Sequence, residues 1–375
     1  MAVLVITLAA GALVCSVLTL LAARSYRRQF PPRLERATPI SILKPLAGVD
    51  EGLEENLRSF FLQDYPEFEI LCAVREAGDP AVVVFEKLRR EYPRVPARLI
   101  VTGEPPYANA KVFSLDRMLA AARYDLLVMS DSDMRVEPQM LRQVAAEFQD
   151  ERLGLATCPY RAVPGRSFWS VLEAIYINTE FLAGVLVARM VEGVKFALGP
   201  TIVARRATLE ALGGLERFKE YLAEDFVMGK LAAEAGWGVI LSSCVVEHRI
   251  GSQQLAENLR HRLRWARSTR RSRPYGYLGQ VFLNPLPLAL IVLVGIPACW
   301  PLALAMAVAR AVAAWAVAGW VLRDPLTARR WYLVPLQDLA SFAIWLAGFF
   351  GNTITWRGRR YYLHRDGRFE LVGPA

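Results

Sequence analysis

The segment Asp125-Leu-Leu-Val-Met-Ser-Asp-Ser-Asp133 decides the fold of this chain. Its apolar run has the length and composition of a buried strand, and Asp131 and Asp133 follow directly. Ligands of open α/β sheets bind at the carboxyl ends of the strands, and carboxylate oxygens suit hard divalent cations. A surface turn is the alternative, but a turn seldom follows a core strand with two carboxylates spaced to share a cation. The segment therefore predicts a cation and nucleotide-diphosphate site at a sheet edge.

Short apolar runs alternate with helical periodicity from residue 37 to residue 275. The predicted strands are residues 40–43, 68–74, 98–101 and 126–130. The predicted helices lie near residues 53–62, 81–90, 112–122 and 138–149. This order favours an α/β fold with a mostly parallel sheet covered by helices. Further along, we expect a partly apolar helix at 168–190, strands at 196–204 and 239–246, and a basic helix at 255–270.

The two ends of the chain are apolar, and 54% of its 375 residues are hydrophobic. Residues 3–23 carry no charge and would reach about 31 Å as a helix, close to the thickness of a bilayer core. A cleaved signal peptide is the alternative, but its charges normally precede a shorter apolar run. We therefore expect residues 1–24 to be an uncleaved anchor. Five arginines follow the uncharged run and place the next region, residues 37–275, in the cytoplasm: Arg24, Arg27, Arg28, Arg33 and Arg36.

Residues 277–352 form the second apolar region. Its candidate membrane segments are residues 281–300, 301–321 and 331–350. The tail, residues 353–375, is basic near its start and should be cytoplasmic, so an even number of crossings must precede it. We therefore predict two spans plus one interfacial or re-entrant segment. The expected protein is a multi-pass integral membrane protein, with a bacterial inner membrane as the expected location.

The net charge of +9 does not indicate nucleic acid as a partner. The basic residues concentrate beside apolar segments, which suits anionic lipid headgroups, and no motif with interleaved aromatic residues accompanies them. The five cysteines are odd in number and widely spaced, so we expect neither a disulfide framework nor a cysteine metal site.

Other charged residues have a functional and a structural interpretation. Asp79 follows the second predicted strand and could contact a uracil or ribose, or cap the next helix. Glu224 and Asp225 precede a helical pattern and could cap it, or supply the general base that a hydroxyl nucleophile needs. Lys111 could contact phosphate, although a solvated lysine is the more common role of such a residue.

The basic helix contains Arg262-Leu-Arg264-Trp265. Arginines at helical spacing can bind a diphosphate as forked donors, and Trp265 can form an apolar wall. A basic face on the membrane surface is the alternative, and we expect both interpretations to hold for different residues.

In this order, the residues resemble the GT-A family of processive and lipid-directed glycosyltransferases. That family has an early Asp, an Asp-x-Asp, a later Glu-Asp or Asp-Asp, and a Gln/Arg-x-x-Arg-Trp. Segments along nearly the whole chain look like ceramide glucosyltransferase, glycosyltransferase family 21: residues 41–48, 53–57, 60–66, 199–201, 213–214 and 222–225. Bacterial hopanoid-biosynthesis glycosyltransferases, which transfer N-acetylglucosamine, are very similar. The tail segment Trp356-Arg-Gly-Arg-Arg360 resembles these enzymes slightly more.

The resemblance implies a GT-A domain that moves glucose or N-acetylglucosamine from a UDP-sugar to a lipid hydroxyl of ceramide or a hopanoid, with inversion. It implies that Asp79 contacts the nucleotide, that Asp131 contacts the UDP-sugar, that Asp133 with Asp131 holds Mg²⁺ or Mn²⁺, and that Asp225 is the base. The remaining predicted substrate contacts are Lys111, Glu224, Arg262, Arg264 and Trp265. The motif's leading residue is His261 here, a departure for which Arg260 or Arg262 could substitute.

The acceptor site is less defined by the sequence. Residues 168–190, with Trp169 and Phe181, could line a lipid groove or form an ordinary core helix. Anchoring at both ends favours a lipid acceptor. A catalytically inactive membrane protein that binds nucleotide sugars is the rival of another class, and the complete set of acids argues against it. A processive polysaccharide synthase is disfavoured because few helices remain for a polymer channel.

Overall fold

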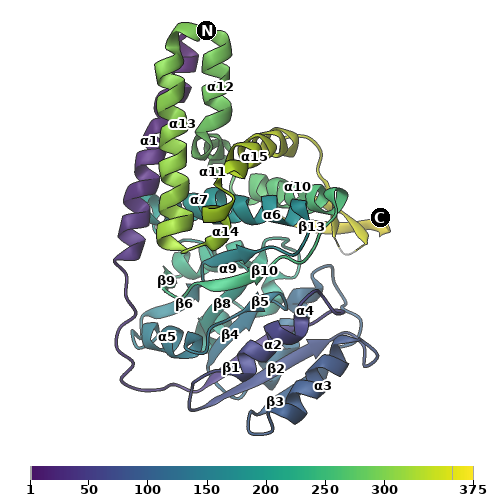
Figure 1. Cartoon of the computed structure of the whole chain (residues 1–375). Helices are drawn as coiled ribbons and strands as arrows, with labels where there is room; N and C mark the ends of the chain where they lie inside the picture. Colours follow the sequence, from purple (N-terminus) through teal and green to yellow (C-terminus); the bar gives the residue numbers. More distant parts are fainter. Residues whose placement is uncertain (1, 357, 375) are drawn as a thin grey trace.

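The computed structural model describes residues 2–356 and 358–374, and its core is a seven-stranded sheet in the order β3-β2-β1-β4-β8-β6-β9 (Figure 1). The strands are β1 (Ile40–Pro45), β2 (Phe68–Val74), β3 (Ala97–Val101), β4 (Leu126–Ser130), β6 (Leu153–Thr157), β8 (Thr201–Arg205) and β9 (Gly238–Leu241). Only β8 runs antiparallel to its neighbours, β4 and β6, so the prediction of a mostly parallel sheet is confirmed.

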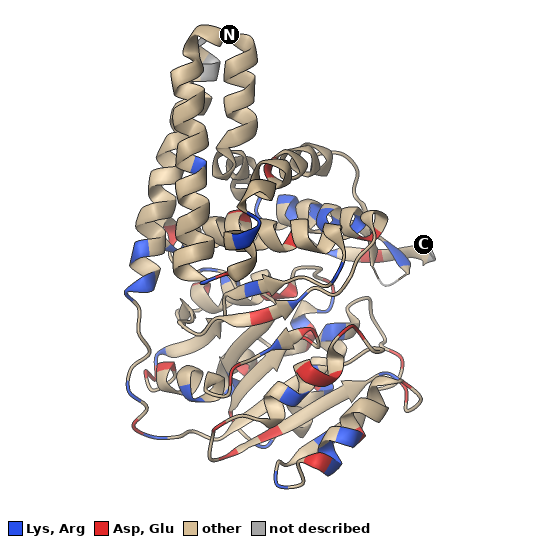
Figure 2. Cartoon of the chain, in the orientation of Figure 1, with Lys and Arg blue, Asp and Glu red and all other residues tan. Residues whose placement is uncertain are grey.

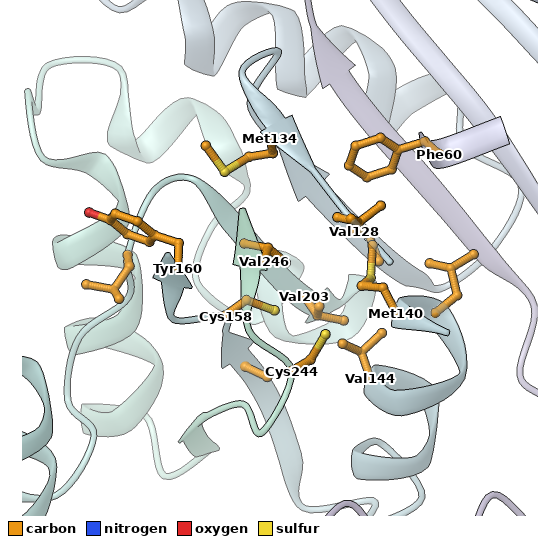
Figure 3. Close-up of a cluster of buried hydrophobic side chains, with 14 of the residues drawn as sticks. Phe60, Val128, Met134, Met140, Val144, Cys158, Tyr160, Val203, Cys244 and Val246 are labelled. Carbon is orange, nitrogen blue, oxygen red and sulfur yellow. The ribbon is translucent and has the colours of Figure 1, made fainter. Parts of the chain in front are cut away.

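Helices cover both faces of this sheet because successive strand residues point to opposite sides. In β4, Leu126 and Val128 join one buried cluster, whereas Leu127 and Met129 join the other. Figure 3 shows part of the first cluster around Val128 and Val203. The covering helices are α2 (Leu53–Phe61), α3 (Ala81–Glu91), α4 (Ala110–Ala121), α5 (Met140–Glu147), α8 (Arg206–Ala211) and α9 (Glu224–Glu234).

Two predicted strands differ from the structure. The strand predicted at 196–204 begins only at Thr201, because Pro200 has no amide hydrogen to contribute to a sheet. The strand predicted at 239–246 is two strands. β9 ends at Leu241, and only the last predicted residue, Val246, belongs to β10 (Val246–Arg249), in a small sheet between β5 (Met134–Arg135) and β7 (Tyr160–Val163). The chain leaves the main sheet at Ser242, whose hydroxyl donates to the buried carboxylate of Glu147 at 2.7 Å.

Three helices project from the α/β domain as a bundle (Figure 1). They are α1 (Ala2–Arg27), α12 (Pro285–Gly295) and α13 (Trp300–Ala314), which continues as the π-helix η5 (Trp315–Val321). Charged residues are sparse in this bundle and gather at its foot (Figure 2). Ile6–Arg27 and Pro297–Val321 are long and apolar enough to cross a membrane. α11 (Pro274–Gly279) with η3 (Gln280–Leu283) meets α12 at a 64° bend, as in a broken span or re-entrant loop.

The predicted helix at 168–190 is a continuous rod with a wide turn at its centre. It consists of α6 (Phe168–Tyr176), the π-helix η1 (Ile177–Phe181) and α7 (Leu182–Glu192). It also has the length and composition of a membrane span. However, 78% of its apolar window is buried inside the protein, and the rod lies across the foot of the bundle (Figure 1). It therefore packs as a core helix between the bundle and the α/β domain.

The last apolar segment folds into α15 (Val334–Gly348), which packs beside α10 (Leu255–Ser272). Its 15 residues span about 22 Å, less than a bilayer core. It lies beside the foot of the bundle and does not run along it (Figure 1), which agrees with one interfacial segment. The number of crossings and the sidedness remain predictions.

The arginines of α10 contact protein where we expected lipid headgroups. Arg267 donates to the carbonyl of Phe350 at 3.0 Å, and Arg270 donates to the carbonyl of Gly351 at 2.8 Å. These carbonyls follow the end of α15, where positive charge is favourable. The tail then folds into a third sheet of β11 (Thr353–Trp356), β12 (Arg359–Leu363) and β13 (Phe369–Pro374), which we had expected only as a basic segment.

Candidate functional site

A cavity of about 1520 Å³ runs from the carboxyl ends of β1, β2 and β4 to the foot of the helical bundle. The loops after these strands form one end, and the other end is lined by apolar residues of α1, α7 and η3, such as Leu18, Val191 and Leu283. All the predicted site residues line this cavity: Asp79, Lys111, Asp131, Asp133, Glu224, Asp225, Arg262, Arg264 and Trp265. The cavity thus joins an acidic region to an apolar one.

Lys111 contacts two of the acidic residues of the cavity. Its Nζ lies 2.7 Å from Oδ1 of Asp131 and 3.5 Å from Oε1 of Glu224. It lies in the first turn of α4, whose cap Asn109 also donates to Glu224 at 3.3 Å. Burial alone would lower the pKa of Lys111, but the two carboxylates outweigh it and raise the pKa. Lys111 is therefore a fixed positive charge inside the cavity wall, not a solvated lysine.

Asp133 faces His248, a residue that the sequence analysis missed. The Nε2 atom of His248 lies 3.1 Å from Oδ2 of Asp133. Burial alone would raise the pKa of Asp133, but His248 brings it below its ordinary value. Only the pairing of β10 with β5 carries His248 to this place, opposite Met134, so no local motif identified it.

The acidic pair fits an open cation site. The Oδ1 atom of Asp133 is buried and has no hydrogen-bond partner among the described residues. Within the same residues, no three His, Cys, Asp or Glu side chains form a closed metal site. Carboxylate oxygens suit Mg²⁺ and Mn²⁺, which keep several ligands from water or a substrate phosphate. The donor set therefore fits a cation whose other ligands come from outside the protein.

Glu224 and Asp225 start α9 in the cavity wall, where Glu224 is buried and Asp225 is half-buried. Burial raises the pKa of Glu224 to about 7, although Lys111 opposes the shift. Burial also raises the pKa of Asp225, while Lys111 and the amides of Phe226 and Gly199 oppose it. A carboxylate with a raised pKa is a better proton acceptor, which is what a general base requires.

Gly199 leaves room for these charged groups. A methyl group on its Cα would lie 2.8 Å from Oδ2 of Asp225 and 3.5 Å from Nζ of Lys111. We expect Gly199→Ala to displace the Asp225 carboxylate and to reduce kcat by about 10²-fold, since small misplacements of a reacting group are that costly. Initial rates and thermal melting test this.

Gly295→Ala is the matched control, because no atom of the described residues lies within 4 Å of the added methyl group there. It should leave kcat unchanged. Full activity of Gly199→Ala would show that the Asp225 carboxylate does not need its present position.

Asp79 accepts a hydrogen bond at the start of a helix, as its structural interpretation predicted, and it also lines the cavity. Its carboxylate accepts from the amide of Gly48 at 3.0 Å and from the amide of Ala81, at the start of α3, at 2.9 Å. Asp79 therefore ties the loop after β1 to the start of α3.

The sequence analysis also missed Lys44. This residue is buried and donates to the carbonyl of Asp131 at 2.6 Å, and burial lowers its pKa to about 8.

The residues of the α10 motif divide into two groups. Trp265 lines the cavity and packs against Phe181, with ring centroids 6.0 Å apart. Arg264 lines it too and lies over the ring of Trp356. Arg262, in contrast, is buried and donates to Ser341 of α15 at 2.9 Å.

We expected Arg262 to contact the diphosphate, but its guanidinium donates to side chains of α15. Its guanidinium also donates to Oε1 of Gln337 at 3.2 Å. His261, at the motif's leading position, lies 2.7 Å from a carboxylate oxygen of Glu173, which is buried in α6. The structure thus places His261 against the core helix.

The C-terminal sheet reaches the segment before Glu224. Tyr221 forms a β-bridge with Arg368, and Leu222 packs in a small cluster with Tyr361 and Phe369. The sheet therefore supports the loop that leads into α9. No sequence signal indicated this sheet, because charged residues interrupt the alternation of apolar residues in the tail.

Comparison with known proteins agrees with this geometry. The profile of glycosyl transferase family 21 matches residues 4–369. Ceramide glucosyltransferase 1 of Caenorhabditis elegans is 31% identical over 206 residues, 54% of this chain and 44% of that protein. Ceramide glucosyltransferase 3 of the same organism is 28% identical over 244 residues, 64% of this chain and 53% of that protein. The alignments thus span about half the length of these relatives.

A solved structure shows the same fold. It is a mannosyltransferase from Pyrobaculum calidifontis in complex with GDP-Man and Mn²⁺. The two chains superpose with a TM-score of 0.54 at 19% identity, over 91% of this chain and 97% of the other. At this identity the likeness concerns the fold alone, and it identifies the α/β domain as GT-A.

Proposed function

This chain belongs to glycosyl transferase family 21, and on that premise we propose that it transfers a hexose from a UDP-sugar to the hydroxyl group of a membrane lipid. One observation carries the proposal. A single cavity contains the acidic residues of a GT-A site and continues to apolar helices at the foot of a membrane-type bundle. A soluble acceptor would not require this apolar end.

The donor binds at the acidic end. The loop held by Asp79 contacts the nucleotide, and Asp131 with Lys111 faces the diphosphate and sugar. Asp133 and Asp131 would hold Mg²⁺ or Mn²⁺, and His248 orients the Asp133 carboxylate. When bound, the cation supplies positive charge against the leaving diphosphate.

The acceptor hydroxyl arrives from the apolar end. Asp225 takes its proton as the oxygen attacks the anomeric carbon in line, which inverts the configuration. Lys111 and Arg264 contribute positive charge near the departing UDP. Trp265 forms an apolar wall on the acceptor side. We assign Arg262 to holding α10 against α15, since its guanidinium is engaged there.

Glucose transfer to ceramide is the first candidate reaction, because the named relatives are ceramide glucosyltransferases. Transfer of N-acetylglucosamine to a polyol hopanoid is the second, favoured by the residues 356–360 of the tail. The proposed topology is multi-pass, with the GT-A domain in the cytoplasm of a bacterial cell. An inactive nucleotide-sugar-binding protein is the alternative, and the convergence of the acidic residues on one cavity argues against it.

The function is tested with purified full-length protein in detergent micelles. Labelled UDP-glucose and UDP-N-acetylglucosamine are each incubated with ceramide and with polyol hopanoid in the presence of Mn²⁺. We expect label in the lipid extract for at least one pair, lost on addition of EDTA. Release of UDP without any labelled lipid, or no turnover in all four mixtures, would reject lipid glycosylation.

A further inference from the structure

Glu180 lies in the wall of the cavity, and one of its carboxylate oxygens has no hydrogen-bond partner in the described part of the chain. It lies in η1, the π-helical turn between α6 and α7, and it lines the cavity. The residue is only 9% exposed, and its Oε2 has no hydrogen-bond partner among the described residues. Buried polar atoms are nearly always hydrogen-bonded, so an unpaired carboxylate oxygen beside a cavity indicates a partner that the protein itself does not provide.

The two basic neighbours of Glu180, Arg310 and Arg262, are engaged with other residues. Arg310 binds both carboxylate oxygens of Asp338, at 2.8 and 2.7 Å, and the hydroxyl of Thr179 at 3.1 Å. Ser341 accepts from Arg262, which leaves its own hydrogen free to bond the carboxyl group of Glu180. One side of the Glu180 carboxyl group is thus anchored, while Oε2 is left for a ligand.

The position of Glu180 connects the two ends of the cavity. The ring of its neighbour Phe181 lies 5.5 Å from that of Tyr160, which in turn lies 5.5 Å from that of His248. Since His248 contacts Asp133, this aromatic wall leads from the acidic end to η1. Beyond η1, α7 contributes apolar lining such as Val185 and Val191.

The backbone at Glu180 is also specialised. π-helical turns inside α-helices occur frequently at functional sites, because the extra residue in the turn redirects a side chain. Asn178 fixes this turn by accepting from the amide of Ala162 at 2.7 Å and donating to Asp324 at 3.0 Å. These contacts hold the turn rigidly, and a residue that recognises a ligand needs such a fixed position.

We propose that Oε2 of Glu180 accepts a hydrogen bond from a second polar group of the acceptor lipid, a hydroxyl or an amide N–H near the hydroxyl that receives the sugar. This inference rests on the proposed function and narrows its substrate class. Ceramide and polyol hopanoids carry such a second donor, whereas diacylglycerol has one hydroxyl and no other donor. Glu180 would therefore select lipids with two donors in the head region.

The test compares kcat/KM for the two-donor lipid with kcat/KM for diacylglycerol, in wild type, Glu180→Ala and Glu180→Gln. The two-donor lipid is ceramide or polyol hopanoid, whichever the wild type uses. Removal of one partner of a buried hydrogen bond leaves the other partner unsatisfied and corresponds to roughly 10- to 100-fold in binding, so Glu180→Ala should reduce this ratio by about that factor. Glu180→Gln keeps an acceptor oxygen and should reduce the ratio less.

Two further measurements separate recognition from damage. The KM for the UDP-sugar and the melting temperature should stay at wild-type values in Glu180→Gln. Because this variant keeps the side-chain volume, it can be measured even if Glu180→Ala folds poorly. Glu234→Ala, an exposed carboxylate on α9, is the control and should leave the ratio unchanged.

An unchanged ratio in Glu180→Gln and in every folded Glu180 variant would overturn the inference while leaving lipid glycosylation intact. A wild type that glycosylates no lipid would overturn the proposed function itself, and the role of Glu180 with it.

Discussion

Replacing Asp225 with asparagine is expected to slow sugar transfer by about 10²- to 10⁴-fold, the usual effect of removing a general base. The substitution keeps the shape of the side chain beside Gly199 but removes its ability to accept a proton. UDP-sugar binding should stay measurable, because the proposed donor contacts lie on Asp79, Lys111 and Asp131. Single-turnover rates and a binding titration with UDP separate the two effects.

The pH profile gives an independent check of this assignment. Burial raises the pKa of Asp225, so its basic form is lost as the pH falls through that raised value. The wild-type rate should therefore decline on the acid side at a pH above the ordinary range of aspartate. The residual activity of Asp225→Asn should lack this decline. Asp64→Asn, an exposed aspartate, is the control, and full activity of Asp225→Asn would contradict a role as the base.

Asp133→Ala is the second large expected loss, roughly 10²- to 10³-fold, because the proposed cation contributes several kcal/mol of charge stabilisation. The atom whose loss matters is the buried Oδ1 of Asp133, which has no hydrogen-bond partner among the residues that the structure describes. The rate of the variant should no longer respond to added Mn²⁺, and UDP should bind equally with and without EDTA. A titration of the initial rate with Mn²⁺ measures this.

Asp150→Ala serves as the control for Asp133, since that carboxylate is half exposed and pairs with Arg152 on the surface. It should keep the wild-type response to Mn²⁺. A response of the same size in Asp133→Ala would show that the cation is held elsewhere.

Much of the α/β domain could be predicted because its signals are local. The strand that ends at Ser130 is a continuous apolar run, and its burial on both faces follows from helices on both sides. Asp131 and Asp133 could be placed because parallel strands end at the same edge of a sheet. The same reasoning predicted that Asp79 lies at this edge. Its carboxylate accepts hydrogen bonds from backbone amides of the protein itself.

The residues that escaped prediction depend on contacts between distant segments. His248 reaches Asp133 only because a four-residue strand leaves the main sheet and pairs with β5. Lys44 looked like an ordinary residue of a strand end, and its burial beneath Asp131 follows from the sheet order. Arg262 was expected at the diphosphate because no sequence pattern shows that α15 returns to cover it.

The location of a bound cation relative to the acidic residues tests the central claim most directly. Crystals of the full chain grown with UDP and Mn²⁺ would give an anomalous difference peak at the metal. The proposed site predicts a peak within coordination distance of Asp133, between its carboxylate and the diphosphate, with Asp225 facing the sugar end of the same cavity. A peak away from Asp133, or UDP bound outside this cavity, would contradict it.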